Sequence, residues 1–368
     1  KEGAAGLLKI GSGYDTSGEL GEDLPKAFAW FQKAADAGNA EGMWNLGLAY
    51  ESGKGVARDE ANAVKWFQKA VDAGDSGGML SLAWYHDQRT GTAKDPQKAQ
   101  VWLHKYVEKE GTAGMATIGD CYALGIGLGE DLPKAVEWYQ KAADAGNSAG
   151  MWDLARCHDQ GTGTVKAPQE ALVWLQKYAA KEGVAGMVRI GQGYDKDGGL
   201  EEDLPKAEEW YRKAAEAGDS NGMWLLARHH DQETGTAKDP QKTQVWLQRY
   251  AEKEGTSGMV KIGKGYDTKG ELGEDLSKAA EWYQKAADAG DSEGMCQLAR
   301  CLERGAGNAP NPQKAQEWLE KYAGREGSAG MVRIGRGYDT DGELGKDLSK
   351  AFVWFQKAAE AGNAEGMM

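Results

Sequence analysis

Cysteine is scarce in this sequence, with four residues in 368. Cys296 and Cys301 lie five positions apart on one predicted helix and therefore point in different directions. Cys121 and Cys157 hold the same place in neighbouring copies of the repeat described below, where helix axes lie about 8–10 Å apart. A disulfide requires Cα atoms about 4.4–6.8 Å apart, so we expect free thiols. Free thiols favour a reducing, intracellular compartment, and nothing else in the sequence indicates the localisation.

Long apolar runs and an excess of basic residues are also missing. No stretch of eighteen apolar residues occurs, and no apolar segment follows Lys1-Glu2-Gly3, so we expect neither membrane insertion nor a signal peptide here. Lysine and arginine number 44 against 57 aspartates and glutamates, which gives a net charge of −13. This balance argues against nucleic acid or an anionic membrane as the partner.

The residue patterns of catalysis and metal binding are absent as well. The sequence has no nucleophile–base pair, no phosphate-binding glycine loop and no Cys/His cluster with metal-ligand spacing. His86, His158 and His230 are too far apart along the chain to share an ion. Acidic turns such as 195–198 lack the spacing to a closing glutamate that a calcium loop needs. We therefore predict no enzyme activity, no cofactor and no metal site.

What the sequence does contain is one unit repeated at a fixed period of 36 residues. Ten copies without an insertion run from Gly6 to Glu365 (360/36 = 10), starting at residues 6, 42, 78, 114, 150, 186, 222, 258, 294 and 330. A tryptophan recurs in register at Trp30, Trp66, Trp102, Trp138, Trp174, Trp210, Trp246, Trp282, Trp318 and Trp354. Such a period predicts a solenoid, so we expect residues 1–368 to form a single continuous domain with partial repeats at both ends.

Each copy predicts two antiparallel helices. A first helix over 40–52 carries its apolar or small residues at the spacing i, i+3, i+4, i+7. In the first copy, Asp23 is a suitable N-cap for the second helix and Pro25 suits its first turn. Gly38 supplies a left-handed C-cap, and the recurring tryptophan falls on the predicted buried face. We therefore expect stacked helical hairpins, with each tryptophan buried to the same depth except near the ends.

The copies are of two kinds, typified by GMVRIGRGYD at 330–339 and GMWLLARHHDQ at 222–232, and they alternate from Gly78 onward. The stretch GMWNLGLAYESGKGVARDEANAVKWFQKAVDAGDS, residues 42–76, resembles the Sel1-like repeat family, relatives of the tetratricopeptide solenoids. The resemblance covers essentially the whole chain. It implies an all-α, right-handed αα-superhelical solenoid whose first helices line the concave surface, and a non-catalytic adaptor or scaffold. Because both ends stop within a repeat, we interpret the chain as a piece of a longer protein.

Basic residues recur three and six places after the opening glycine, on the side of the first helix that points away from its apolar stripe. They are Arg156, Arg189, Arg228, Lys261, Lys264, Arg300, Arg333 and Arg336, opposed by only Asp120 and Asp153. Clustered arginines suit the capture of carboxylate or phosphate groups. The alternative is that these cations pair with the chain's own acids one turn on, at Asp195, Asp231, Asp267, Glu303 and Asp339.

An apolar patch nearer the N-terminus is predicted at Trp44, Leu48 and Trp84. The eight basic residues from Arg156 to Arg336 form what we call the basic stripe. Together with this stripe, the apolar patch predicts a non-enzymatic scaffold that binds an acidic peptide or protein surface on its concave face. Two alternatives remain: a rigid spacer subunit in a large assembly, and a binder of an anionic small molecule or polysaccharide. The partner's identity and the oligomeric state are not indicated by the sequence.

A second tryptophan set lies two places after the opening glycine, on the flank of the first helix. If this flank faces the preceding repeat, the ring meets a small or medium residue there: Trp44 meets Gly13, Trp152 meets Cys121 and Trp224 meets Gly193. The opposite flank would set Trp44 against Tyr85, two bulky rings together. Close packing therefore predicts contact with the preceding repeat.

Overall fold

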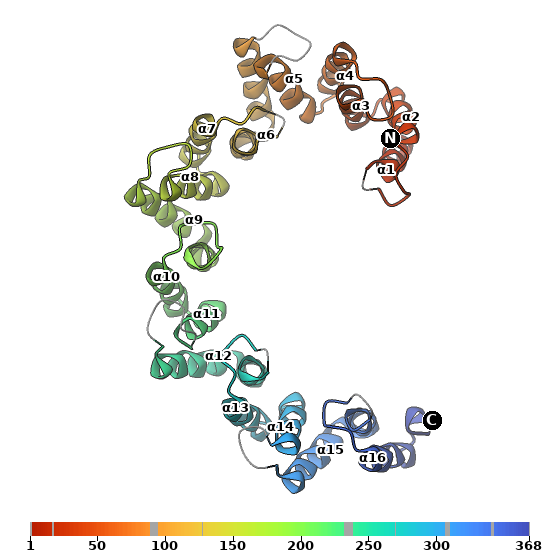
Figure 1. Cartoon of the computed structure of the whole chain (residues 1–368), viewed down its shortest axis with the longest axis vertical. Helices are drawn as coiled ribbons and strands as arrows, with labels where there is room; N and C mark the ends of the chain where they lie inside the picture. Colours follow the sequence, from red (N-terminus) through yellow and green to blue (C-terminus); the bar gives the residue numbers. More distant parts are fainter. Residues whose placement is uncertain are drawn as a thin grey trace. The chain divides into compact units, whose positions relative to one another are not determined.

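The structure is a computed structural model of the chain, and it describes residues 2–16, 18–88, 95–126, 128–231, 238–268, 270–305, 310–339 and 342–367. These residues contain sixteen α-helices, one short 3-10 helix and no strand. Consecutive helices pack on one another from α1 (Glu2–Tyr14) to α8 (Ser148–Gln160) in one compact unit and from α10 (Leu204–Glu216) to α16 (Leu348–Glu360) in a second (Figure 1). The predicted all-α repeat solenoid is therefore confirmed, while its right-handedness stays a prediction.

The described chain divides into two compact units. Unit 1 comprises Lys1–Gly183 with Gly199–Glu201, and unit 2 comprises Val184–Gly198 with Glu202–Met368. Unit 1 contains α1 (Glu2–Tyr14), α2 (Leu24–Asp36), α3 (Ala40–Ser52), α4 (Glu60–Asp72), α5 (Gly77–Gln88), α6 (Pro96–Leu124), α7 (Leu132–Asp144), α8 (Ser148–Gln160) and the first part of α9 (Pro168–Tyr194). Unit 2 holds the rest of α9 with α10 (Leu204–Glu216), α11 (Ser220–Asp231), α12 (Pro240–Tyr266), α13 (Leu276–Asp288), α14 (Ser292–Arg304), α15 (Pro312–Gly337), α16 (Leu348–Glu360) and η1 (Ala364–Met367). The single continuous domain that the period predicts stays a prediction.

The predicted helix bounds and caps of the first two repeats are present in the structure. The first helix expected over 40–52 is α3, with the same bounds. The side chain of Asp23 accepts a hydrogen bond from the backbone N–H of Lys26 at the start of α2, and Pro25 lies in that helix's first turn. Gly38 has φ +81°, the left-handed conformation expected after the helix ends.

From Gly111 onward, every second junction between repeats has a different construction. In α6, α9, α12 and α15 the second helix of one repeat runs into the first helix of the next, interrupted at a single glycine. These glycines are Gly111, Gly183, Gly255 and Gly327, with φ of +65° or +66° and ψ between −143° and −150°. Only glycine adopts this conformation without strain, so in α6, α12 and α15, each of which lies within one unit, it sets the angle between the two helices.

The recurring tryptophans share one contact. In each copy the ammonium or guanidinium group three residues later lies over the indole ring, at 3.7 Å for Lys177 on Trp174 and 4.7 Å for Arg249 on Trp246. The prediction of equal depth is wrong for Trp66, Trp102 and Trp318, which are only half-buried, as is Trp30 near the N-terminus. The six others are buried. Because one face of each ring is covered by a flexible cation, the ring lies where core meets surface, and its exposure varies between repeats.

The flank prediction is wrong for Trp44 and Trp224, because these two rings face the following repeat. A Cβ placed on Gly265 would lie 2.8 Å from Cη2 of Trp224, and the Trp224 ring also contacts the Tyr250 ring at a tilt of 50°, with centroids 5.6 Å apart. Trp44 belongs to the core cluster that includes Tyr85, on α5. The two bulky rings fit because the indole of Trp44 lies against Gly77 and donates a hydrogen bond to Ser81 Oγ at 3.1 Å. The space for the indole is supplied by Gly77 and Ser81, two small residues of α5.

The junction glycine and a neighbouring glycine in α15 give a matched test of this geometry. Gly327→Ala should lower the free energy of unfolding by about 1–3 kcal/mol, because its φ of +66° strains any L-residue. Gly324→Ala should raise it by about 0.5–1 kcal/mol, because Gly324 is helical. A Cβ at either position meets nothing within 4 Å, so packing is unchanged in both variants. Urea unfolding of both measures the difference, and equal effects would contradict the account.

Candidate functional site

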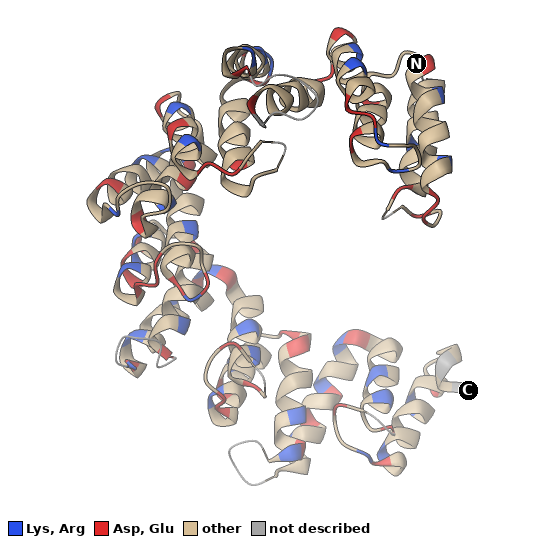
Figure 2. Cartoon of the chain, turned by 45° about the horizontal axis from the view of Figure 1, so that its top comes forward, with Lys and Arg blue, Asp and Glu red and all other residues tan. Residues whose placement is uncertain are grey.

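All eight cations of the predicted stripe lie on first helices. Arg156 lies on α8, Arg189 on α9, Arg228 on α11, Lys261 and Lys264 on α12, Arg300 on α14, and Arg333 and Arg336 on α15. Arg156 belongs to unit 1 and the other seven belong to unit 2. Acidic residues are interspersed with basic ones along the helices (Figure 2). The local partners of each cation therefore decide how much positive charge remains available.

Arg228 and Arg300 each belong to a cluster of three side chains within unit 2. Tyr211 donates its hydroxyl to Asp195 Oδ2 at 3.0 Å, and Arg228 Nη2 lies 3.7 Å from the same oxygen. One repeat pair further on, Tyr283 donates to Asp267 Oδ2 at 3.1 Å, and the Arg300 guanidinium bonds to that oxygen as well. We call each set a Tyr–Asp–Arg cluster. Tyr211 and Tyr283 lie on second helices, so the cluster ties one repeat to the first helix of the next.

The surroundings of Asp267 favour its charged form. Burial alone raises the pKa of this carboxyl, but the backbone N–H of Thr268 and the charge and hydrogen bond of Arg300 together lower it below its usual value. Burial, together with the charge on Asp267, raises the pKa of Tyr283 far above the usual range, so its hydroxyl remains a donor. Side-chain exposure is only 18% for Arg300 and 13% for Asp267. This cation is therefore a part of the repeat interface.

Lys264 and Arg333 share one carboxylate. Glu293 Oε1 lies 3.4 Å from Lys264 Nζ, and its Oε2 lies 3.0 Å from Arg333 Nη2. Burial raises the pKa of Glu293, but a hydrogen bond from Gln297 and the two cations lower it overall. Both cations keep more than half of their side-chain surface exposed, at 56% and 57%. They are therefore anchored at one carboxylate and open to solvent elsewhere.

The remaining cations have other surroundings. Lys261 Nζ lies 4.6 Å from the ring centre of Trp224 and 5.4 Å from that of Tyr250. Arg156 pairs with Asp153 at 2.9 Å, one turn away on α8. Arg189 and Arg336 are exposed, and each also interacts with other residues.

The predicted self-pairing is therefore present for part of the stripe. Asp195 and Asp267 do pair with stripe cations, as the alternative expected. Asp231 instead accepts the backbone N–H of Gly273 at 2.6 Å, and Glu303 accepts from Tyr338 and Lys350. The half-buried Arg228 and Arg300 are bound internally, while Arg189, Lys261, Lys264, Arg333 and Arg336 are exposed. A role of the stripe in partner binding stays a prediction.

The predicted apolar patch is brought together in unit 1. Trp44, Leu48 and Trp84 are half-buried and pack on one core cluster formed by Ala63, Phe67, Leu82 and Tyr85. The Trp84 and Tyr85 rings meet edge to face, with centroids 4.8 Å apart. The three side chains thus share one neighbourhood, with part of each exposed to solvent.

His229, His230 and three of the cysteines are buried, whereas His86, His158 and Cys121 are half-buried and His104 is exposed. Burial lowers the pKa of His230, which is 2% exposed, and raises the pKa of Cys121, Cys157 and Cys301 to about 11. The four cysteines are free. Among the residues that the structure describes, no three His, Cys, Asp or Glu side chains converge in a way that could hold a metal ion.

Two features were missed by sequence reasoning. Glu293 was not identified as the residue that joins Lys264 and Arg333, and a cavity beside Asp15 was not foreseen. Aligning the repeats position by position supplies a signal for the cavity, because Asp15 matches Asp195 and Asp267 while the residues facing it differ. Glu293 carries no comparable signal, because its pairing with residues of α12 and α15 depends on how far the side chains reach.

Ten tandem two-helix units with this register define an αα-repeat protein. The Sel1 repeat profile matches ten times, at residues 4–39, 40–75, 76–106, 112–147, 148–182, 184–219, 220–254, 257–291, 292–323 and 328–363. The chain therefore belongs to the Sel1 repeat family, whose solenoids are typically protein-interaction scaffolds and generally non-catalytic. A search of curated proteins finds no match.

Several solved structures are similar to this chain. A protective antigen of uropathogenic Escherichia coli strains that displays an SLR fold is 28% identical, with a TM-score of 0.37, over 99% of this chain and 78% of that one. A Sel1 repeat protein from Oxalobacter formigenes is 32% identical, with a TM-score of 0.38, over 58% of this chain and 88% of that one. The immunity protein Pa5087 from Pseudomonas aeruginosa is 16% identical, with a TM-score of 0.25, over 68% of this chain and 82% of that one.

In the described parts of the chain, no helix combines the length and the apolar character needed to cross a bilayer.

The Arg300–Asp267 pair predicts a pH-dependent contribution to stability. Arg300→Gln should lower the free energy of unfolding at neutral pH by about 1–3 kcal/mol, because it leaves the Asp267 carboxylate without its cation. The folded-state pKa of Asp267 is lowered, so this stability is present above the unfolded pKa of about 3.9 and is lost as pH falls through the folded value.

Urea unfolding at a series of pH values tests this. The difference between the parent and Arg300→Gln should shrink below about pH 4. Arg212→Gln, at an exposed position on α10, is the control and should change stability by less than about 0.5 kcal/mol. A difference that stays constant at every pH would contradict the pairing.

Proposed function

We propose that this Sel1 repeat protein is a scaffold that holds an acidic peptide or acidic protein surface on the first-helix face of unit 2. The contact residues are the five exposed cations Arg189, Lys261, Lys264, Arg333 and Arg336. They lie on α9, α12 and α15, so an extended peptide would meet them on alternate repeats. Arginine suits this role because its planar fork binds carboxylates through two hydrogen bonds.

The observation that supports this proposal most is the position of Glu293. Glu293, at the start of α14, bonds to Lys264 on α12 and to Arg333 on α15. A carboxylate of the chain itself thus occupies the place where a ligand carboxylate would bind. Beside it lies an open cleft of about 410 Å³, lined by Ser257, Val260, Lys261, Lys264, Asp291 and Glu293. An acidic ligand in this cleft would compete with Glu293 for both cations.

Lys261 and Trp224 extend this site. The Lys261 ammonium lies over the Trp224 ring, and the Trp224 Nε1 donates to Glu271 Oε2 at 2.8 Å. The aromatic face orients the ammonium without neutralising it, because a ring carries no net charge. Lys261 therefore keeps its charge available to a ligand more fully than Arg228 and Arg300, whose cations already have carboxylate partners.

Competition by Glu293 gives a test with two opposite outcomes. Glu293→Gln should strengthen the binding of a fluorescein-labelled oligoglutamate peptide about two- to fivefold, because it frees two exposed cations. Lys264→Glu combined with Arg333→Glu should weaken binding by about tenfold or more. Binding of the parent should also weaken as salt is added. Fluorescence anisotropy measures all three effects.

The controls separate site binding from general charge effects. An oligolysine peptide with the same label should not respond to Glu293→Gln, and the exposed Arg212→Gln should leave oligoglutamate binding unchanged. Tight binding that ignores these substitutions and ionic strength would contradict the proposal. No binding at all would favour the rigid spacer, the alternative supported by the internal pairing of Arg156, Arg228 and Arg300.

A further inference from the structure

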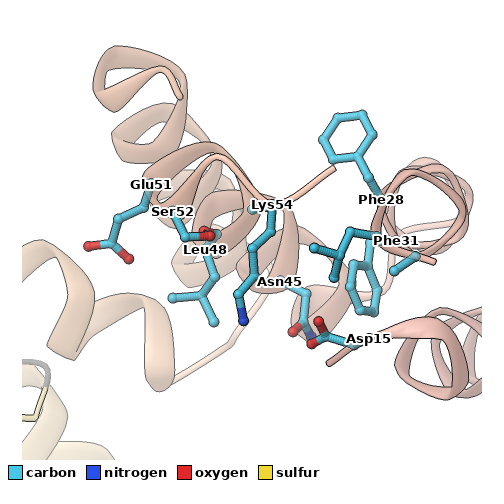
Figure 3. A pocket seen from close by; sticks show the side chains of 11 residues that line it. Asp15, Phe28, Phe31, Asn45, Leu48, Glu51, Ser52 and Lys54 are labelled. Carbon is cyan, nitrogen blue, oxygen red and sulfur yellow. The ribbon is translucent and has the colours of Figure 1, made fainter. Parts of the chain in front are cut away.

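Unit 1 contains a cavity of about 220 Å³ among α1, α2 and α3, with room for several water molecules (Figure 3). Its apolar wall includes Phe28, Phe31 and Leu48. Its polar wall includes Asp15, at the C-terminal end of α1, and Asn45 on α3. The side chains of Asp15 and Asn45 point toward one another (Figure 3). The cavity thus combines aromatic and aliphatic surface with the carboxylate of Asp15.

The carboxylate of Asp15 is only partly engaged. Thr16 donates to its Oδ1 twice, from the backbone N–H at 2.9 Å and from Oγ1 at 3.1 Å. In the part of the chain that the structure describes, both hydrogen bonds to the Asp15 side chain reach this one oxygen. Lys54 also lines the cavity, and its Nζ donates to Thr16 Oγ1 at 3.0 Å. Asp15 is half-buried, so its second oxygen can take a donor from a side chain inside the cavity.

The repeat register shows what occupies this place elsewhere in the chain. Asp15, Phe31 and Leu48 correspond to Asp195, Tyr211 and Arg228, five periods or 180 residues further on. They also correspond to Asp267, Tyr283 and Arg300, seven periods or 252 residues further on. These six residues are the two Tyr–Asp–Arg clusters. In both clusters a tyrosine hydroxyl and an arginine guanidinium bond to the aspartate.

The first repeat keeps the aspartate and replaces both of its partners. Phe31 has the ring of Tyr211 but no hydroxyl, and Leu48 has no guanidinium. The carboxylate, the ring and the aliphatic wall remain. The hydroxyl and the guanidinium of the other two clusters are missing, and a cavity remains in their place. We propose that this cavity takes an arginine side chain from a partner protein, in the place that Arg228 and Arg300 fill from within the chain.

The chemistry of the walls fits arginine better than lysine. A guanidinium is planar, is more weakly hydrated than an ammonium and stacks on aromatic rings, so Phe28 and Phe31 suit it. Its methylene groups would pack on Leu48, as long basic side chains do on apolar surface. The charge balance also fits, because Asp15 and Glu51 line the cavity together with only one cation, Lys54. This site is independent of the proposed function, because it lies in unit 1 and selects the opposite charge.

A blocked Gly-Arg-Gly peptide titrated into the full chain by calorimetry tests the proposal. It should bind, and the same peptide with lysine or norleucine in place of arginine should bind about tenfold more weakly or worse, since a charge-assisted hydrogen bond is lost or misplaced. Asp15→Asn should weaken the arginine peptide about tenfold or more, while Glu19→Gln, at an exposed position in the same unit, should not. Equal binding of the norleucine peptide, or binding that ignores Asp15→Asn, would overturn the proposal.

A second variant fills the cavity from within. Phe31→Tyr with Leu48→Arg rebuilds the Tyr–Asp–Arg cluster, so it should abolish binding of the arginine peptide while circular dichroism shows an unchanged helix content. If this variant fails to fold, Asp15→Asn and Glu19→Gln decide the question. Free arginine is titrated in the same way as a last comparison. If it binds more tightly than the blocked peptide, the cavity is a small-molecule site and the assignment to a partner protein is overturned. Unchanged peptide binding by the folded double variant would also overturn it.

Discussion

The two helices of a repeat are held at their spacing by one contact between a small residue and a large one. A Cβ placed on Gly47 would lie 2.4 Å from Cε1 of Phe67, and one on Gly119 would lie 2.5 Å from the ring of Tyr139. Real Cβ atoms do not approach so closely, so the first helix can lie against the ring only because glycine has no side chain. The same contact joins Gly11 to Phe31, Gly191 to Tyr211, Gly263 to Tyr283 and Gly335 to Phe355. In the remaining four repeats the same two register positions hold alanine and leucine, at Ala83 and Leu103, Ala155 and Leu175, Ala227 and Leu247, and Ala299 and Leu319, all of them buried.

This size rule explains why two kinds of repeat alternate while the period stays fixed at 36. Each kind fills the space inside its hairpin by a different pair, and the junction glycines such as Gly255 set the angle to the next hairpin. Packing inside the hairpin therefore places few constraints on which residues occupy the face of the first helix that points away from its apolar stripe. On that face the chain places arginines bound to carboxylates, such as Arg228 and Arg300, in some repeats, exposed cations in others, and near the N-terminus a leucine, Leu48, beside Asp15. One scaffold thereby carries surfaces that differ from repeat to repeat.

Much of this architecture could be predicted from the sequence, because period, caps and apolar spacing act locally. The bounds of α3, the Asp23 cap and the all-α class follow from such signals. The direction faced by Trp224 could not, because it depends on the rotation of one hairpin against the next, and small residues existed on both sides. The division of the basic stripe into internally paired and exposed cations could not be predicted from the sequence either. That division depends on distances of a few ångströms between side chains from different repeats, as for Glu293.

A double-mutant cycle at Gly47 and Phe67 tests the central contact most directly, because the phenylalanine has no hydroxyl whose loss would add a second effect. Gly47→Ala alone should lower the free energy of unfolding by about 1–3 kcal/mol, through overpacking against the ring. Phe67→Leu alone should also destabilise, by leaving a cavity. The double variant carries the alanine–leucine pair of the other repeats, so it should be more stable than the sum of the two single effects by about 1 kcal/mol or more. Additive effects would contradict the account.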